Sequence, residues 1–325
     1  MKKMTVRGTR SLLIAAVLLA VCNPAFALDK IRVAKGGLAL MFTVIEVGQM
    51  AKIWESYGLE ITAIQTDGQA PMDKAMISGD VDIALGAGTS MAFRLKGVPN
   101  IAIAAMSGPP ADFVLVINPD GPIKKVEDLK GKAVGVTSAG SLTYYFVKAL
   151  AQEKGWGPDG ITPQPLGNSR ANFAALARGD IAAMVTTPET AFDYAERGRA
   201  AVLLSFGDVI KTFLTHTILA SNDMVTKHPD QVERFLKGWF KTIKFMKDPA
   251  NREASVKQIA SVLKISEKAA GQAFDIDVGA LSDDGAFDPA SVDVIRNTLP
   301  SFGILDSVPA AKDLYTDKFV PVKLQ

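Results

Sequence analysis

The segment Ala75-Met-Ile-Ser-Gly79-Asp80-Val-Asp-Ile-Ala-Leu85 decides the fold, because it returns later in the chain as Ala175-Leu-Ala-Arg-Gly179-Asp180-Ile-Ala-Ala-Met-Val185. In both copies a helical pattern ends at Gly-Asp and an apolar strand follows. A chain that repeats this unit is expected to build one α/β lobe twice. A cleft between two such lobes is then the expected place for a ligand.

The elements around the two copies follow the same order. The first half predicts a strand, a glycine break, an amphipathic helix and a strand at 31–34, 36–37, 38–57 and 58–64. The second half repeats them at 133–136, 139–140, 141–154 and 161–166. Strands that alternate with helices predict parallel sheets covered on both faces. We therefore predict a two-lobed α/β protein, with chance matches between α/β segments as the alternative.

The first 27 residues have the three parts of a secretory signal. Four basic residues precede the apolar run 12–21, and Ala25-Phe26-Ala27 is a small-residue cleavage site. The run is too short to cross a bilayer, which takes about 20 residues. Cleavage after Ala27 predicts a periplasmic chain that begins at Leu28. A lipoprotein acylated at Cys22 is the alternative, although Val21 is larger than the residue that normally precedes such a cysteine.

Composition excludes several function classes. Removing the signal changes the formal net charge from +2 to −2, so binding to nucleic acid or anionic lipid is not expected. Cys22 is the only cysteine, which leaves the mature chain without a disulfide or a thiol nucleophile. His216 and His228 are isolated from any nucleophile or metal-ligand spacing, and the five aspartates between 275 and 288 predict a solvated loop. We therefore expect no enzyme activity, metal or cofactor.

Two turn-rich connections, 107–111 and 212–222, are expected to carry the chain between the lobes. The helical residues after the second connection are expected to return to the first lobe. The sequence thus predicts lobe I from 28–111 and 221–325, and lobe II from 112–220. Two crossing strands would form a hinge that limits motion mainly to opening and closing.

Several motifs together resemble a known family. They are Gly79-Asp80-Val81-Asp82-Ile83-Ala84, Val126-Glu-Asp-Leu-Lys-Gly-Lys-Ala-Val-Gly-Val136, Ala139-Gly140-Ser141, Ala175-Leu-Ala-Arg-Gly-Asp-Ile181, His228-Pro-Asp-Gln-Val232 and Pro309-Ala-Ala-Lys-Asp-Leu-Tyr315. The chain is similar to the type II periplasmic solute-binding proteins of ABC importers, in the branch associated with nitrate, sulfonates, taurine and thiamine-precursor pyrimidines. One departure is Ala182, where the family has an acid. This change is expected to affect packing rather than binding.

The resemblance implies a monomeric periplasmic receptor that closes around a small solute and delivers it to an inner-membrane permease and its ATPase subunit. The sequence has no phosphate-binding loop with its lysine, so ATP hydrolysis is expected in another subunit. An exported ligand-sensing protein and an enzyme on the same scaffold are the alternatives.

The candidate binding residues lie where predicted strands end and helices begin. Ligands of open α/β sheets bind there, and helix N-termini favour an anionic group. The candidates are Gly37, Leu38, Gly88, Thr89, Ser90, Ser138, Gly140, Ser141, Asn168, Arg170, Thr187 and Glu189, together with Ser107 from the first crossing. Helix capping alone is the alternative role of each.

The side chains suggest a ligand class. Arg170 is expected to bind an anionic group and Glu189 an amine or ring nitrogen, which would fit a zwitterion; a surface ion pair and a helix-start charge are the alternatives. Phe42 and Tyr144 could stack on a flat ligand, or pack in the core. A sulfonate, an aromatic carboxylate, a pyrimidine and nitrate all remain open. An organic ligand is favoured, because nitrate would leave the aromatic side chains unused.

Overall fold

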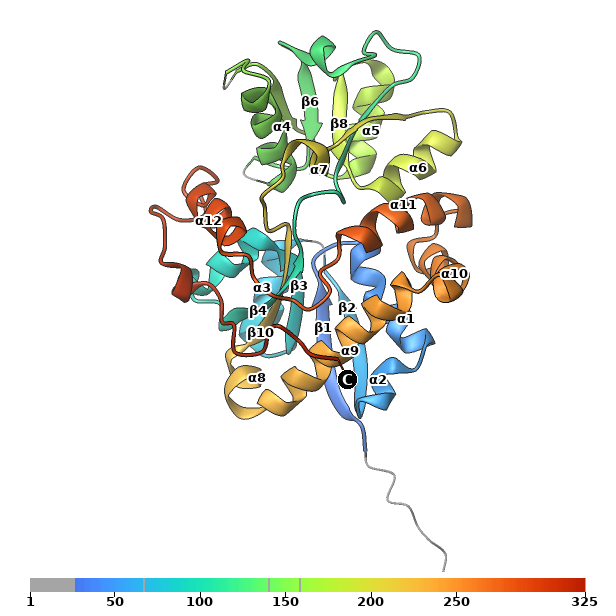
Figure 1. Cartoon of the computed structure of the whole chain (residues 1–325). Helices are drawn as coiled ribbons and strands as arrows, with labels where there is room; N and C mark the ends of the chain where they lie inside the picture. The colour runs from blue at the N-terminus through green and yellow to red at the C-terminus, as the bar shows by residue number, and fades with distance from the viewer. Residues whose placement is uncertain (1–26, 67, 140, 158, 325) are drawn as a thin grey trace, which may run out of the picture.

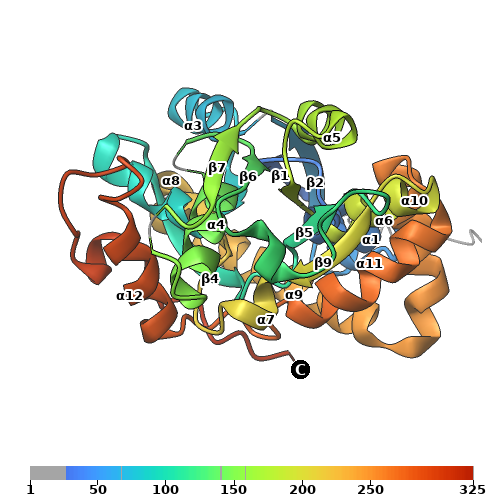
Figure 2. The same cartoon turned by 90° about the horizontal axis from the view of Figure 1, so that it is seen from above.

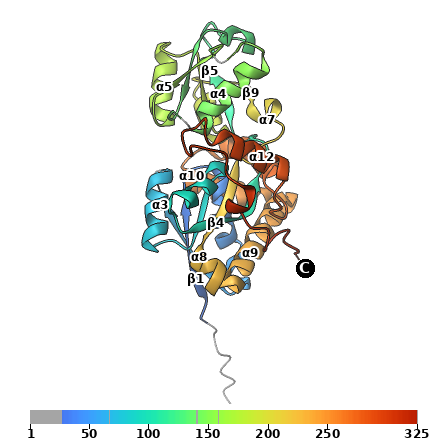
Figure 3. The ribbon, with the colours of Figure 1, turned by 90° about the vertical axis from the view of Figure 1, so that its left-hand side faces the viewer.

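The computed structural model describes residues 27–66, 68–139, 141–157 and 159–324. The predicted signal segment up to residue 26, with Cys22, and the candidate residue Gly140 lie outside the described residues. Two lobes, each built on a five-stranded sheet, stand one above the other in perpendicular views (Figure 1 and Figure 3). This arrangement confirms the predicted two-lobed α/β fold. None of the described helices is both long and apolar enough to cross a membrane.

The sheet of lobe I has the strand order β2-β1-β3-β10-β4. Its first strand, β1, pairs in parallel with β2 and β3, whereas β10 runs antiparallel between β3 and β4. The bounds of these strands are Asp29–Lys35 for β1, Leu59–Gln65 for β2, Ile83–Ala87 for β3, Asn100–Ser107 for β4 and His216–Ser221 for β10.

The sheet of lobe II repeats this order as β7-β6-β8-β5-β9. Here β6 pairs in parallel with β7 and β8, and β5 is the antiparallel strand. In each sheet the antiparallel strand is the one that the chain forms directly after crossing from the other lobe. The two sheets therefore share the same strand order and the same position of the antiparallel strand. The bounds are Val114–Ile117 for β5, Ala133–Val136 for β6, Thr162–Pro165 for β7, Ala183–Thr186 for β8 and Ala201–Ser205 for β9.

The two Gly-Asp turns end equivalent helices, α3 (Gln69–Ser78) and α5 (Ser169–Arg178). Gly79 and Gly179 adopt left-handed conformations, with φ of 75° and 79°. The next residue then donates its backbone N–H to the helix, from Asp80 to the Ala75 carbonyl at 2.9 Å and from Asp180 to the Ala175 carbonyl at 3.0 Å. Glycine recurs at this position because it reaches the left-handed region without steric cost.

Lobe I contains an ion pair, Arg32 with Asp82, that lobe II lacks, because lobe II has alanine at both equivalent positions, one of which is Ala182. In lobe I the Asp82 carboxylate accepts hydrogen bonds from the Arg32 guanidinium at 2.7 and 3.0 Å and from the Arg32 backbone N–H at 2.8 Å. The β6–β8 register places Ala133 and Ala182 at the equivalent positions of lobe II. None of these residues lines the cavity described below, and an effect of the change on the packing of the sheet stays a prediction.

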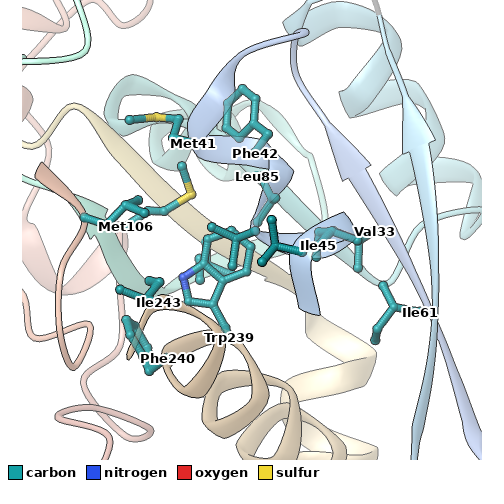
Figure 4. Close-up of a cluster of buried hydrophobic side chains, with 14 of the residues drawn as sticks. Val33, Met41, Phe42, Ile45, Ile61, Leu85, Met106, Trp239, Phe240 and Ile243 are labelled. Atoms are coloured by element: carbon teal, nitrogen blue, oxygen red, sulfur yellow. The ribbon is translucent and has the colours of Figure 1, made fainter. Parts of the chain in front are cut away.

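The helical C-terminal part of the chain covers lobe I. The amphipathic helix α9 places Trp239, Phe240 and Ile243 against Ile45, Leu85 and Met106 in the main core (Figure 4). These side chains are at most 1% exposed. The helices of this part are α8 Asn222–Lys227, α9 Pro229–Lys247, α10 Arg252–Leu263, α11 Glu267–Ala280 and α12 Pro289–Thr298, with the 3₁₀ turns η4 Pro249–Asn251 and η5 Ala311–Asp313.

The continuous helix predicted for 38–57 is wrong. The chain forms η1 (Leu40–Thr43), α1 (Val44–Met50) and α2 (Ile53–Ser56), and Lys52 between the last two has a φ of 54°. The break folds Trp54 back, so that its indole N–H donates to the Ile45 carbonyl at 2.9 Å. A Cβ on Gly48 would lie 2.5 Å from the Trp54 indole nitrogen, so this fold-back depends on glycine there.

The two crossings between the lobes lie side by side. The first leads from β4 to β5, and the second leads from α7 (Phe206–Val209) to β10. The backbone N–H of Thr215 on the second crossing donates to the Ser107 and Gly108 carbonyls of the first, at 3.2 Å each. Residues 216–220, which the sequence division counted with lobe II, form β10 in the sheet of lobe I. We propose the predicted lobe division with this strand moved to lobe I.

The lobes also meet through two helices. The lobe II helix α6 (Pro188–Glu196) packs against α11, which belongs to the C-terminal part on lobe I (Figure 1). Lobe II further contains the helix α4 (Leu142–Glu153) and the 3₁₀ turn η3 (Val126–Leu129), whereas the 3₁₀ segment η2 (Gly88–Lys96) lies in lobe I.

Candidate ligand-binding site between the lobes

A cavity of about 660 Å³ lies between the lobes and is lined by residues of both. Its walls come from the segments that follow β1, β3, β6 and β8, which are the carboxyl ends of parallel strands in the two sheets. The sequence predicted a cleft at these ends for this topological reason. The lining residues are Gly36, Gly37, Leu38, Ala39, Phe42, Gly68, Gln69, Met72, Gly86, Ala87, Thr89, Phe93, Phe113, Thr137, Ser138, Ala139, Ser141, Leu142, Thr143, Thr187, His216, Phe302 and Ile304.

Seven of the predicted site residues line this cavity. They come from both lobes, and four carry hydroxyl groups. The seven are Gly37, Leu38, Phe42, Thr89, Ser138, Ser141 and Thr187.

Other predicted residues serve the framework around the cavity. Ser90 is fully buried and donates its hydroxyl to the Gln69 side chain. A Cβ on Gly88 would lie 2.0 Å from the Leu214 carbonyl oxygen, so this glycine permits contact between η2 and the second crossing. Asn168 caps α5 by accepting the Ala171 N–H at 3.1 Å. Tyr144 packs, partly buried, against the core of lobe II.

Arg170 does not lie among the cavity residues. It is exposed and lines a separate hollow of about 590 Å³ between α5 and α6, together with Arg197 and Arg199. The hollow also includes Ala174 and Ala177, which lie on the same helical stripe as Arg170. The first turn of α5 therefore directs this position away from the cavity, and the anionic contact expected of Arg170 stays a prediction.

A network of hydroxyl groups marks the lobe II wall at the start of α4. The Thr143 hydroxyl oxygen accepts the backbone N–H of Thr137 at 3.0 Å and lies 2.9 Å from the Ser141 hydroxyl. Ser141 also caps α4 by accepting the Tyr144 N–H at 3.2 Å. The described residues that line the cavity include no lysine, arginine, aspartate or glutamate. Hydroxyls, one amide, one imidazole and the helix start therefore supply the polar contacts, and aromatic side chains supply the apolar ones.

His216, which appeared isolated in the sequence, lies in the wall of this cavity. Its Nδ1 is 3.3 Å from the Ser107 hydroxyl and 3.4 Å from Oδ2 of Asp112. The ring meets Phe42 edge-on at 5.4 Å and stacks on Phe113 at 6.2 Å. No sequence spacing could indicate this group, because Ser107 and Asp112 lie on the other crossing between the lobes.

The contacts of His216 indicate what the group can do. Burial lowers the pKa of His216 to about 3 and raises the pKa of Asp112 to about 8, so both side chains are uncharged near neutral pH. Ser107 and Asp112 both meet the same ring nitrogen. A serine–histidine–aspartate relay needs them on opposite nitrogens. The geometry thus favours a positioned hydrogen-bonding ring over an activated nucleophile.

Glu189 and Asp277 lie behind the cavity, at the contact between the lobes. Glu189 does not line the cavity; its Oε1 accepts the Leu40 N–H of lobe I at 3.4 Å, and burial raises its pKa to about 6. Asp277 lies in α11 and is 1% exposed, so the solvated loop predicted from 275 onward is wrong at this position. Burial, followed by repulsion from Glu189 and Asp112, raises the pKa of Asp277 well above its usual value.

Solved structures with the same fold are distant in sequence. The periplasmic aliphatic sulphonate-binding protein SsuA from Escherichia coli is 16% identical, with 91% of this chain and 94% of that chain covered and a TM-score of 0.75. The ligand-binding component of an ABC-type import system from Staphylococcus aureus is 15% identical, with 91% and 100% covered and a TM-score of 0.75. The periplasmic nitrate-binding protein NrtA from Synechocystis is 11% identical, with 74% and 69% covered and a TM-score of 0.61.

Sequence comparison identifies the family. Among curated proteins, none matches the chain significantly. The family model described as NMT1/THI5 like matches residues 43–252, which is more than half of the chain. The match spans both lobes and the first part of the C-terminal helices, and the chain therefore belongs to the NMT1/THI5-like family.

Proposed function

We propose that this protein is the extracytoplasmic solute receptor of an ABC importer, and that it binds a small organic anion or zwitterion between its lobes. The observation that carries the proposal is the cavity lined by both lobes at the carboxyl ends of their strands. The family and the names of the similar structures support a binding role.

The size and lining of the cavity favour an organic solute over nitrate. Pockets for small organic ligands typically occupy about 300–1,000 Å³, and this cavity has about 660 Å³. Nitrate would leave most of that volume empty, and the rings of Phe42, Phe113 and Phe302 would have no contact with the ligand. A sulfonate, an aromatic carboxylate or a pyrimidine has an apolar part that these rings can cover.

The acidic or hydrogen-bonding end of the solute is assigned to the lobe II wall. Thr137, Ser141 and Thr143 surround the start of α4, a helix of 12 residues whose N-terminal dipole end favours negative charge. We also assign a hydrogen bond to the solute from the His216 ring, which lines the cavity beside the hinge. This arrangement replaces the Arg170 contact as the source of anion affinity.

The test is thermal unfolding of residues 28–325 against taurine, an alkanesulfonate, benzoate, an aminopyrimidine and nitrate. A ligand at 100 times its Kd adds about 2.7 kcal/mol of stability, which is easily visible as a raised midpoint. Mass spectrometry of the denatured, freshly purified protein controls for a solute that was already bound. If no compound raises the midpoint and no solute is released, the proposed ligand class is wrong.

Delivery to a permease needs its own experiment. Cells that use the identified solute as a sole nutrient should lose growth when the protein is deleted. Deletion that leaves uptake intact but alters a signalling response would instead favour a ligand-sensing protein.

A further inference from the structure

Four titratable side chains from four separate segments meet where the lobes touch. Asp112 lies on the first crossing and His216 at the end of the second; Glu189 begins α6 of lobe II, and Asp277 lies in α11 on lobe I. Each is less than a tenth exposed. The helices α6 and α11 pack against each other, and burial, followed by repulsion from nearby Glu189 and Asp112, raises the pKa of Asp277.

The carboxyl groups of this cluster have few partners. Among the described residues, one oxygen of each acid receives no hydrogen bond: Asp112 Oδ1, Glu189 Oε2 and Asp277 Oδ1. The Glu189 carboxyl group is otherwise hydrogen-bonded by its own backbone N–H, by the Thr187 side chain and, at 3.4 Å, by the Leu40 N–H. A buried carboxylate without a partner is strongly unfavourable, whereas its protonated form is much less so.

The basic groups nearby are engaged elsewhere. On α6, Arg197 pairs with Asp193, and Glu196 meets Ser266 and Lys268 of α11. On α11 itself, Asp275 pairs with Arg252; next to η1, Lys35 pairs with Glu46. The described residues place no lysine or arginine in an ion pair with the three acids, and burial lowers the pKa of His216, which lies beside Asp112, to about 3. Closing the lobes therefore brings the acids together without a neutralising cation near neutral pH.

We propose that closure of the lobes takes up protons at Asp112, Glu189 and Asp277, so that the closed form is favoured in acid and the lobes open as the pH rises. This behaviour belongs to the contact between the lobes and needs no solute. Proton uptake on closure can therefore be disproved while the proposed receptor function stands, and the receptor function can be disproved while proton uptake stands.

The direction follows from comparing closed and open forms. A solvated carboxyl group has a pKa of about 4, whereas in this structure, in which the lobes are in contact, burial raises the pKa to about 8 at Asp112 and to about 6 at Glu189. Closing the lobes therefore binds protons at any pH between the solvated pKa of each acid and its raised pKa in the contact. His216 acts in the opposite sense below pH of about 6.5, because its neutral form is the buried one. Above that pH only the acids contribute, so the window from about 6.5 to 8 isolates their effect.

A distance measurement between the lobes tests the proposal. Since residues 28–325 contain no cysteine, Lys74→Cys in α3 and Ala174→Cys in α5 accept a fluorophore pair at equivalent exposed sites. These helices lie along one edge of the two lobes (Figure 2). Between pH 6.5 and 8 the open-to-closed ratio of the solute-free protein should rise about tenfold per pH unit for each proton taken up.

Matched substitutions assign the effect to the cluster. Asp277→Asn should lower the number of protons taken up on closing by up to one, and so flatten the pH dependence of the open-to-closed ratio. Asp275→Asn, two residues away on the exposed face of α11, should keep the pH dependence of the parent protein. Glu189→Gln, on the other lobe, should reduce the slope below pH 6.5, which gives a second reading if Asp277→Asn does not fold. A distance that stays constant across the window, or a parent slope in both cluster variants, would overturn the proposal.

Discussion

Nδ1 of His216 lies 3.4 Å from Oδ2 of Asp112, and the two residues lie on different crossings between the lobes. The contact therefore joins the two strands of the hinge at the wall of the binding cavity. Because both groups are buried and Asp112 has no lysine or arginine partner among the described side chains, the protonation of Asp112 is expected to affect stability.

Asp112→Asn should reduce the loss of stability at alkaline pH. Burial raises the pKa of Asp112 to about 8, above an unfolded value of about 3.9. Its contribution is fully present below pH of about 4 and is lost as the pH rises towards 8, by up to about 1.4 kcal/mol per pH unit. Urea unfolding at pH 6.5 and 8 should show a smaller difference in the variant than in the parent. Asp120→Asn, on an exposed loop, is the control and should behave as the parent does.

Thr143→Val should weaken solute binding by about tenfold, because valine keeps the shape but leaves the Thr137 N–H without its acceptor. The readout is titration with the compound that raises the unfolding midpoint. Thr226→Val, which removes an exposed hydroxyl on α8, should leave affinity unchanged.

Arg170→Ala should also leave affinity unchanged, because Arg170 lines the hollow between α5 and α6 rather than the cavity. The same titration measures it. A loss of tenfold or more would restore Arg170 as an anion contact and would show that the lobes rearrange on binding.

Gly79→Ala should destabilise lobe I by about 1 kcal/mol through backbone strain alone. The glycine has a φ of 75°, and no atom lies within 4 Å of an added Cβ, so crowding makes no contribution. Gly279→Ala is the matched control, because that glycine also has open space but no positive φ, and lies in α11. Alanine there should be neutral or stabilising by up to about 1 kcal/mol. Equal destabilisation of both variants in thermal unfolding would contradict this explanation.

Asp82→Ala should cost about 1–2 kcal/mol, because it leaves the Arg32 backbone N–H without its acceptor and ends a partly exposed ion pair. Arg32→Ala should cost less, since the carboxylate keeps that backbone contact. The double variant, which reproduces the alanine pair of lobe II, should cost less than the sum of the two. Additive costs in a double-mutant cycle would mean that the two side chains do not interact.

Much of the fold could be predicted from the sequence because its signals are local. Gly79 and Gly179 end equivalent helices, and the apolar runs between them form the paired strands in the predicted order. The position of the cavity also follows, since parallel strands present their carboxyl ends at one edge. The helix break at Lys52 could not be predicted, because it depends on Trp54 packing over Gly48 in the folded protein.

The sequence by itself determined the repeated α/β architecture, the NMT1/THI5-like family and the helix starts that surround the cavity. Only the tertiary structure decided which side chains enter that cavity, because a rotation within one helical turn separates Arg170 on the outside from the buried Asn172 and Phe173. It also brought His216, Asp112, Glu189 and Asp277 together. These residues come from four segments, and their protonation depends on a burial that exists only when the lobes are packed.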